Sequence, residues 1–342
     1  MFSVPCPARL APSRLLRGLP HRLALLVCLL VVAGAAHAAW FKDEAAIMGT
    51  RVAVELWHED PAAARAAMDA VLTEMRRIDA AMSPLRTDSE LARLNREAAR
   101  HPVEVSAELY DLIARAQRFS RLSDGAFDIT FASVGHLYDF RRGIAPDAAQ
   151  IAAALPGIDY HQVILEDGHR IRFARPEVVV DLGGIAKGHA VDRAIALLQA
   201  RGIREALVSA GGDSRILGDH HGRPWTIGIR DPYREKGSAV VLPLSNTALS
   251  TSGDYERFFM RDGVRFHHIL SPRTGRPVHG TRSVTILGPD ATTTDALSTT
   301  VFVLGAEAGL ALIESLPGIE AVLIDDQGRL HFTRGLAPPT TP

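Results

Sequence analysis

The order of helix and strand patterns constrains the fold of this chain most strongly. Helical spacing of apolar residues predicts helices over Pro61–Met82, over Val105–Leu122 with Ser106 as N-cap, and over Val191–Arg201 with Gly202 closing it. Short alternating runs, which predict strands, are Arg51–Leu56, His161–Phe173, Ala206–Ser209, Trp225–Ile229, Val240–Leu244 and Ser283–Leu287. Because these elements follow no strict βαβ rhythm and no repeat, the pattern favours an α+β fold over a doubly wound sheet or a solenoid.

The composition is that of a globular protein and excludes some classes of partner. Of the 342 residues, 47% are hydrophobic and 23% are charged, with a formal net charge of −1. No global positive field attracts nucleic acid, so we predict no nucleic-acid partner. Any phosphate recognition must come from local groups.

The first 38 residues have the pattern of a signal peptide. Arginines precede the apolar run LALLVCLLVVAGAAHA, which is short for a membrane span and ends in Ala36-His37-Ala38, a small-x-small cleavage pattern. We therefore expect residues 1–38 to be removed, residues 39–342 to form the mature domain, and the protein to be periplasmic. The alternative is an uncleaved anchor at the inner membrane. Cys6 and Cys28 both lie in this segment, so the expected mature chain has no disulfide and no thiolate chemistry.

Glycine-rich stretches suggest a phosphate-binding turn. DLGGIAKGHAVD, from Asp181, follows the apolar run Val178–Val180, which is predicted to be a strand, and precedes a helix. SAGGDSRILG begins at Ser209. The first stretch places Lys187 at a helix N-terminus, where backbone N–H groups favour anions. Its spacing matches neither a Walker loop nor a dinucleotide-binding fingerprint. A tight turn with a solvated lysine explains the same residues, and the two readings stay open here.

A histidine pair and an arginine turn form a second candidate cluster in RFHHILSPRTGRPV, from Arg265. The pattern predicts that His267 and His268 leave a strand and that the following Pro-Arg-Thr-Gly turn brings a guanidinium close to a base. The alternative is a hairpin with inert exposed histidines. A zinc site is disfavoured because no further ligand has zinc-like spacing.

The stretch TTTDALSTTVFVLG, from Thr292, suggests a hard-oxygen metal site. If a helix has already begun, Asp295 and Thr299 share one face one turn apart. A carboxylate and a hydroxyl suit Mg²⁺ better than zinc or copper. The alternative, favoured by this stretch alone, is that a residue among Thr292–Asp295 is simply the N-cap.

Taken together, these stretches resemble the FAD:protein FMN transferase family, the ApbE-type flavin transferases. The matching text is IMGT at Ile47, DGAFDIT at Asp124, DLGGIAKGHAVD at Asp181, SAGGD at Ser209, STSGDYER at Ser250, HHILSPRTG at His267 and TDALSTTVFVLG at Thr294. The resemblance implies mixed, mainly antiparallel sheets with packed helices. It also implies Mg²⁺-dependent cleavage of FAD, transfer of FMN to a threonine or serine hydroxyl of an exported or membrane-bound flavoprotein, and release of AMP.

The resemblance also assigns site residues. It implies that Asp295 and Thr299, with the backbone carbonyl of Ala186, hold Mg²⁺, and that His268 is the catalytic histidine. The residues that fall where the family contacts FAD are Met48, Leu85, Ala126, Phe127, Asp128, Gly183, Lys187, His189 and Ile269.

Departures from the family pattern concern ring contacts more than the reaction. Leu85 replaces an aromatic residue, His189 a tyrosine, and Ser271 an aspartate. Two alternatives accompany the transferase hypothesis: a Mg²⁺-dependent diphosphatase that hydrolyses FAD to FMN and AMP, and a flavin-binding protein without catalytic activity. The Asp295/Thr299 pair and His268 argue against the second, because a carrier needs no site that activates a diphosphate.

Overall fold

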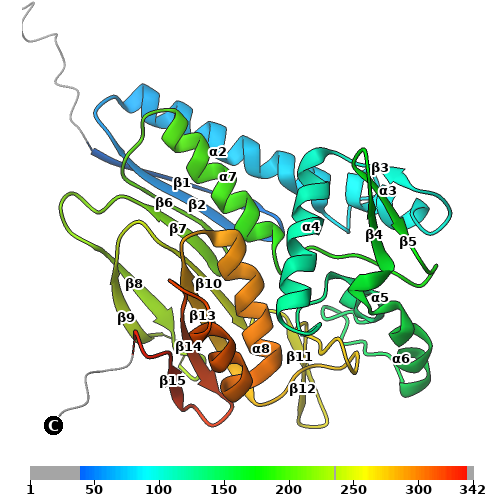
Figure 1. Cartoon of the computed structure of the whole chain (residues 1–342). Helices are drawn as coiled ribbons and strands as arrows, with labels where there is room; N and C mark the ends of the chain where they lie inside the picture. The colour runs from blue at the N-terminus through cyan, green and yellow to red at the C-terminus, as the bar shows by residue number, and fades with distance from the viewer. Residues whose placement is uncertain (1–38, 235, 337–342) are drawn as a thin grey trace, which may run out of the picture.

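An eight-stranded antiparallel sheet forms the centre of the fold (Figure 1). The computed structural model describes residues 39–234 and 236–336, so the predicted signal peptide lies outside the described residues. In spatial order the strands are β1 (Ala39–Ile47), β2 (Thr50–His58), β6 (Ala206–Ala210), β7 (Asp213–Leu217), β10 (Ala248–Gly253), β13 (Thr281–Gly288), β14 (Glu320–Asp325) and β15 (Leu330–Phe332).

Three smaller antiparallel sheets surround this central sheet. They consist of β3 (Val103–Glu104), β5 (Arg170–Phe173) and β4 (Val163–Glu166); β8 (Trp225–Arg230) and β9 (Ser238–Leu244); and β11 (Phe258–Arg261) and β12 (Val264–His267). With the helices described next, they confirm the predicted α+β class with mainly antiparallel sheets.

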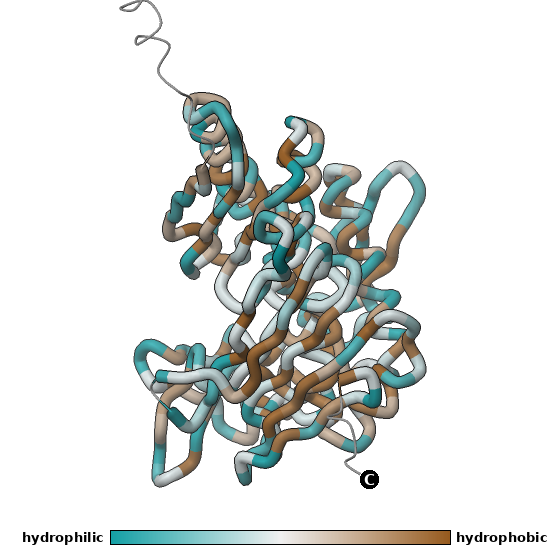
Figure 2. The backbone as a smooth tube through the Cα atoms, turned by 90° about the vertical axis from the view of Figure 1, so that its left-hand side faces the viewer, coloured by the Kyte–Doolittle hydropathy of each residue, from teal (hydrophilic) through white to brown (hydrophobic). Residues whose placement is uncertain are grey.

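Helices form a layer on one face of the large sheet. The helices are α2 (Pro61–Met82), α3 (Glu90–Glu97), α4 (Ala107–Leu122), α5 (Ala132–Gly135), α6 (Ala148–Ala154), α7 (Ala186–Ala200) and α8 (Ala291–Glu314). Of these, α2, α7 and α8 pack on the sheet, and α7 lies against α8 (Figure 1). Apolar side chains from the inner strands and from α2 and α7 make up the main core, and Figure 2 shows hydrophobic segments along the strands and hydrophilic loop tips.

The predicted helices at Pro61–Met82 and around Ser106 are confirmed. Asp60 caps α2 by accepting the Ala62 N–H at 2.8 Å, and Ser106 caps α4 by accepting the Leu109 N–H at 3.2 Å. Each cap satisfies one of the N–H groups that a helix start leaves without a partner.

Helix α8 begins before Asp295, as the metal-site hypothesis requires. Its N-cap is Asp290, which accepts the Thr293 N–H at 2.8 Å, so the alternative that placed the N-cap within Thr292–Asp295 is wrong. The helix is interrupted at Gly305, whose φ is 77°. By length and composition α8 could cross a membrane, a test that buried core helices also pass, and here it packs between α7 and strands β10 and β13.

The structure differs from the predicted strands in two of the predicted runs. The run at His161–Phe173 is a hairpin, β4 and β5, because His169 (φ 54°) and Gly168 (φ 73°) make a turn inside it. Val178–Val180 forms no strand ladder: the Asn95 side chain accepts the Val180 N–H at 2.8 Å and donates to the Val180 carbonyl at 2.9 Å.

The helix predicted from Val191 starts at Ala186. The turn before it closes with the Ala186 N–H donating to the Leu182 carbonyl at 2.8 Å, which carries the chain directly into α7. The early start brings Lys187 and Gly188 into the first turn of the helix.

Candidate active site

The glycine-rich turn from Asp181 is held by its own first residue. The Asp181 carboxylate accepts the Gly183 N–H at 2.6 Å, and the Lys187 ammonium donates to the Gly183 carbonyl at 3.2 Å. Burial raises the pKa of Asp181. The predicted arrangement, a glycine turn with a lysine at a helix N-terminus, is therefore present in the folded chain.

Lys187 lies between two buried carboxylates. Its ammonium is 2.7 Å from Oδ2 of Asp213 and 3.3 Å from each carboxylate oxygen of Asp295, and the Gly188 N–H donates to Oδ2 of Asp295 at 3.0 Å. Both carboxylate side chains are 3% exposed. Burial, and secondly the negative charge of Asp213, raise the pKa of Asp295 to about 7. The two acids together raise the pKa of Lys187.

Thr299 brings a hydroxyl to the same place, one helical turn after Asp295. A β-carbon on Gly184 would lie 3.2 Å from Oγ1 of Thr299, so the glycine turn is in direct contact with this face of α8. Ser252, at the end of β10, lies 3.3 Å from the Thr299 hydroxyl. Ala186, the third residue assigned to metal binding, is buried in the first turn of α7.

This donor set fits a hard divalent cation. The cluster holds two carboxylates and one ammonium, so it keeps an uncompensated negative charge when Asp295 is ionised. The surrounding donors are hydroxyl and backbone oxygens, which suit Mg²⁺. Among the described residues no group of three or more His, Cys, Asp or Glu side chains could hold a metal ion. A cation here would therefore complete its coordination with water or ligand oxygens.

The two neighbouring histidines have different environments. Nε2 of His267 lies 2.6 Å from the Val278 carbonyl and must donate to it, while Nδ1 accepts the Ile269 N–H at 3.3 Å. Both ring nitrogens of His267 are thus occupied in a neutral imidazole. Nδ1 of His268 is buried and has no hydrogen-bond partner among the described residues. Of the pair, His268 is the one with a ring nitrogen free to accept a proton.

The arginine whose charge acts on His268 is not the one that the sequence suggested. Arg273, in the Pro-Arg-Thr-Gly turn, forms an ion pair with Asp124 at 3.0 Å on the surface, in place of the predicted approach to a histidine. The His268 N–H instead donates to the Arg257 carbonyl at 3.2 Å. Burial, and secondly the positive charge of Arg257, lower the pKa of His268 to about 3.

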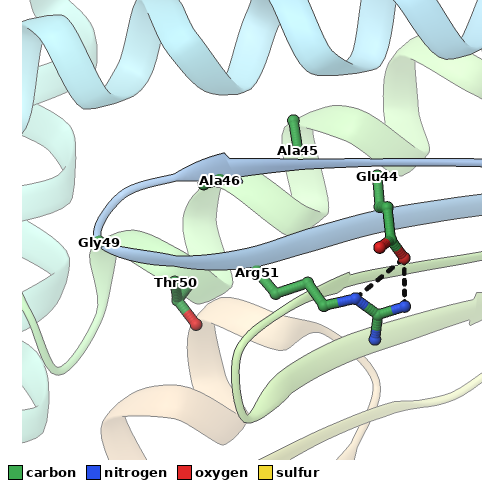
Figure 3. Close-up of a pocket in the computed structure, with 6 residues that line it drawn as sticks. All are labelled: Glu44, Ala45, Ala46, Gly49, Thr50 and Arg51. Atoms are coloured by element: carbon green, nitrogen blue, oxygen red, sulfur yellow. Dashed lines mark hydrogen bonds and ion pairs between the residues drawn. The ribbon is translucent and has the colours of Figure 1, made fainter.

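Several of the predicted flavin contacts border this cluster. Met48 and Gly49, with φ of 55° and 69°, form the two-residue turn of the β1–β2 hairpin, where Figure 3 labels Gly49. The Phe127 ring lies 3.2 Å from a β-carbon built on Gly184, and Ile269 follows His268 directly.

The neighbours of Phe127 have structural contacts. Ala126 is buried, and the buried carboxylate of Asp128 accepts the N–H groups of Thr130 at 2.8 Å and Tyr160 at 2.9 Å. The Asp128 side chain thus caps the following helical turn, and its contact with FAD stays a prediction.

Two predicted contacts lie elsewhere in the structure. The Leu85 side chain is 89% exposed in the turn after α2. Nε2 of His189 lies 3.0 Å from Glu108, in a polar groove of about 730 Å³ between α2, α4 and α7. The contacts of Leu85 and His189 with FAD stay predictions, and the structure does not bring these two residues to the Lys187 cluster.

A second hollow, of about 410 Å³, lies beside the β1–β2 hairpin (Figure 3). It is lined by Gly49, Thr50 and the ion pair of Arg51 with Glu44. None of the predicted contact residues lines this hollow.

Three residues of this region were not singled out from the sequence: Asp213, Ser252 and Arg257. All three lie inside quoted motifs, SAGGD and STSGDYER. The motifs therefore contained these residues, but the spacing within a motif does not show which of its side chains faces the Lys187 cluster.

The fold and this site define a class of α+β proteins. In this class a glycine-rich turn, a lysine and buried carboxylates meet at the first turns of two packed helices. Such an arrangement is suited to a phosphorylated ligand and a hard cation. Within that class, the chain belongs to the ApbE family, whose model matches residues 48–323.

Relatives and solved structures agree with this assignment. The chain is 36% identical to an FAD:protein FMN transferase of Treponema pallidum, over 92% of this chain and 94% of that protein. It is 34% identical to an FAD:protein FMN transferase of Vibrio cholerae, over 75% of this chain and 79% of that protein.

Among solved structures, the ApbE protein of Thermotoga maritima superimposes with a TM-score of 0.81 at 35% identity, covering 87% of this chain and 98% of that one. The flavin transferase ApbE of Vibrio cholerae gives 0.79 at 30% identity, with the same two coverages. Both likenesses extend over most of the described residues.

Proposed function

We propose that this chain is a Mg²⁺-dependent FAD:protein FMN transferase, which moves FMN from FAD to a serine or threonine hydroxyl of an exported flavoprotein. The observation that carries the proposal is the contact of the Asp181–Gly188 turn with Asp295 and Thr299. Relatives named FAD:protein FMN transferase match 92% and 75% of the chain, which supports the transferase class.

In the proposed reaction the phosphoanhydride bond of FAD breaks and a phosphoester bond to the acceptor oxygen forms. AMP leaves, and the hydroxyl proton passes to a base. His268 is the proposed base, because its imidazole is neutral at neutral pH and its Nδ1 has no hydrogen-bond partner among the described residues. A positioned general base contributes on the order of 10²–10⁴-fold to such a step.

Asp295, Thr299 and the carbonyl of Ala186 are the proposed Mg²⁺ ligands. Mg²⁺ bound there would offset the negative charge of the diphosphate during transfer. Lys187 holds Asp295 in place and is itself retained by its shorter contact with Asp213. The backbone N–H groups of the glycine turn can face a phosphate, as they commonly do at helix N-termini.

A single assay separates transfer from hydrolysis. The mature chain is incubated with FAD and Mg²⁺, with and without an exported flavoprotein as acceptor, and AMP and in-gel flavin fluorescence are measured. Transfer predicts a fluorescent acceptor and acceptor-dependent AMP. Equal AMP and free FMN without acceptor would identify a diphosphatase, and unchanged FAD would exclude both activities.

We further propose that the protein acts in the periplasm. The support is the arginine-rich, apolar N-terminal sequence ending at Ala38. The intact mass of the protein recovered from the periplasm should correspond to a chain that starts at Ala39. A full-length mass in the membrane fraction would indicate the anchored form.

A further inference from the structure

The Arg257 side chain has an unusual environment for an arginine beside a predicted site. It is exposed, and it donates no hydrogen bond and forms no ion pair with any residue in the described ranges 39–234 and 236–336. The other guanidinium considered for this role, that of Arg273, is already neutralised by Asp124. Arg257 therefore offers five N–H donors and a full charge to a ligand.

Arg257 also lies beside two of the predicted flavin-binding segments, and its charge acts on a third. Its Nη2 is 3.4 Å from the position of a β-carbon on Gly49, so the guanidinium lies directly against the Met48–Gly49 turn (Figure 3 shows this turn). Its carbonyl accepts the N–H of His268. Its charge acts on the half-buried carboxylate of Asp181, at the start of the glycine turn.

We infer that Arg257 binds a phosphate group of the flavin dinucleotide, as a second cation in addition to Lys187. This inference rests on the proposed function. Lys187 is shared between Asp213 and Asp295, so its charge is already balanced within the protein. A diphosphate brings further negative charge, and a guanidinium without a counterion is suited to bind it bidentately.

The unpaired charge of Arg257 also affects the protonation of His268. Two cations, Arg257 and Lys187, both disfavour a proton on His268. An anion bound to Arg257 would offset part of this charge and would favour proton uptake by His268 when the substrate is present.

The test compares two pairs of ligands, FMN with riboflavin and AMP with adenosine, and the members of each pair differ only by a phosphate. Dissociation constants for FMN, riboflavin, AMP and adenosine are measured by calorimetry for the wild type, Arg257→Gln and Arg257→Lys. We expect Arg257→Gln to raise the dissociation constant of FMN or of AMP about tenfold or more. The dissociation constants of riboflavin and adenosine should stay within about twofold of the wild-type values. Arg257→Lys should recover part of the loss. Arg273→Gln, the matched control, removes a guanidinium that has its own counterion and should change none of the four.

Two outcomes would overturn the inference. Equal weakening of riboflavin and FMN by Arg257→Gln would show a packing role, and unchanged binding of all four ligands would show no role. If either result is obtained while the wild-type protein still modifies its acceptor, the inference fails and the proposed transferase function stands. A wild type that binds neither FMN nor FAD would overturn the inference and the proposed function together.

Discussion

The hydrogen bonds of each side chain decide which of two adjacent histidines has a ring nitrogen that can accept a proton. The residue pattern alone could not separate His267 from His268, since the two are adjacent at the end of one strand; only the family resemblance assigned His268. The fold does so, because the Val278 carbonyl and the Ile269 N–H use both ring nitrogens of His267. These partners lie eleven residues and two residues further along the chain, and no spacing rule specifies them.

The lowered pKa of His268 predicts an acid-sensitive contribution to stability. The folded state holds this proton less well than the unfolded state, where the pKa is near 6.5, so stability is lost as pH falls from 6.5 toward 3. Between pH 6.5 and 4 the loss is up to about 3 kcal/mol. Urea unfolding at these two pH values should show a smaller decrease for His268→Gln than for the wild type.

An exposed histidine provides the control for this experiment. His101→Gln, whose side chain is exposed in the wild type and forms no ion pair with a described residue, should keep the wild-type decrease. Equal decreases in all three proteins would contradict the assignment of the acid sensitivity to His268.

Adjacent threonines on α8 test the metal assignment. The Thr299 hydroxyl borders the glycine turn, whereas the buried Thr300 hydroxyl donates to the Ala296 carbonyl at 2.7 Å within the helix. Thr299→Val should raise the Mg²⁺ concentration needed for half-maximal transfer by about tenfold or more. Thr300→Val should leave that concentration unchanged. A wild-type Mg²⁺ requirement in Thr299→Val would remove this residue from the site.

At the scale of elements, the sequence predicted those helices and strands whose boundaries depend on residues close together in the chain. The capped helices α2 and α4 follow from apolar spacing and cap residues, and strands β2, β6 and β13 of the large sheet follow from alternation. The other five strands of that sheet were not predicted. The run Val178–Val180 was mistaken for a strand because its apolar residues are buried, while its N–H groups are satisfied by side chains of Asn95 and Ser133. Such partners are distant in sequence and leave no local pattern.

The candidate site was predictable in part. The Asp295–Thr299 spacing and the glycine turn suggested cation and phosphate chemistry, and the family resemblance joined them. The role of Asp213 depends on the contact between β7 and α7, and that of Arg257 on the contact of the segment after β10 with the β1–β2 turn. These contacts arise only in the folded chain.

The close approach of α7 and α8 depends on Gly188. A β-carbon there would lie 2.1 Å from the Ala291 carbonyl oxygen and 2.8 Å from Cβ of Asp295. Gly188→Ala must therefore separate the two helices and should lower the free energy of unfolding by about 3 kcal/mol, together with a loss of transfer activity. Chemical denaturation and the activity assay measure the two effects.

Gly202→Ala is the comparison for this variant. Its β-carbon would meet no atom within 4 Å, and only its φ of 79° opposes the substitution. The expected cost is about 1 kcal/mol with activity retained. A smaller cost for Gly188→Ala than for Gly202→Ala would contradict the packing argument.

At the scale of the whole molecule, the sheet and its helical layer bring distant segments to one place. The cluster combines the turn before α7, the start of β7, the first turns of α8 and the segment after β12. No single segment carries enough groups to bind and activate a diphosphate. The long-range antiparallel pairing of the sheet is therefore a condition for activity as well as for stability.

The central claim is most directly tested by the intact mass of an acceptor protein. An exported flavoprotein is incubated with the mature chain, FAD and Mg²⁺, and is then analysed by mass spectrometry with peptide mapping. The account predicts a gain equal to one FMN less one water on a serine or threonine, and no gain with Asp295→Ala. An unmodified acceptor, in the presence of folded wild-type protein that binds FAD, would contradict it.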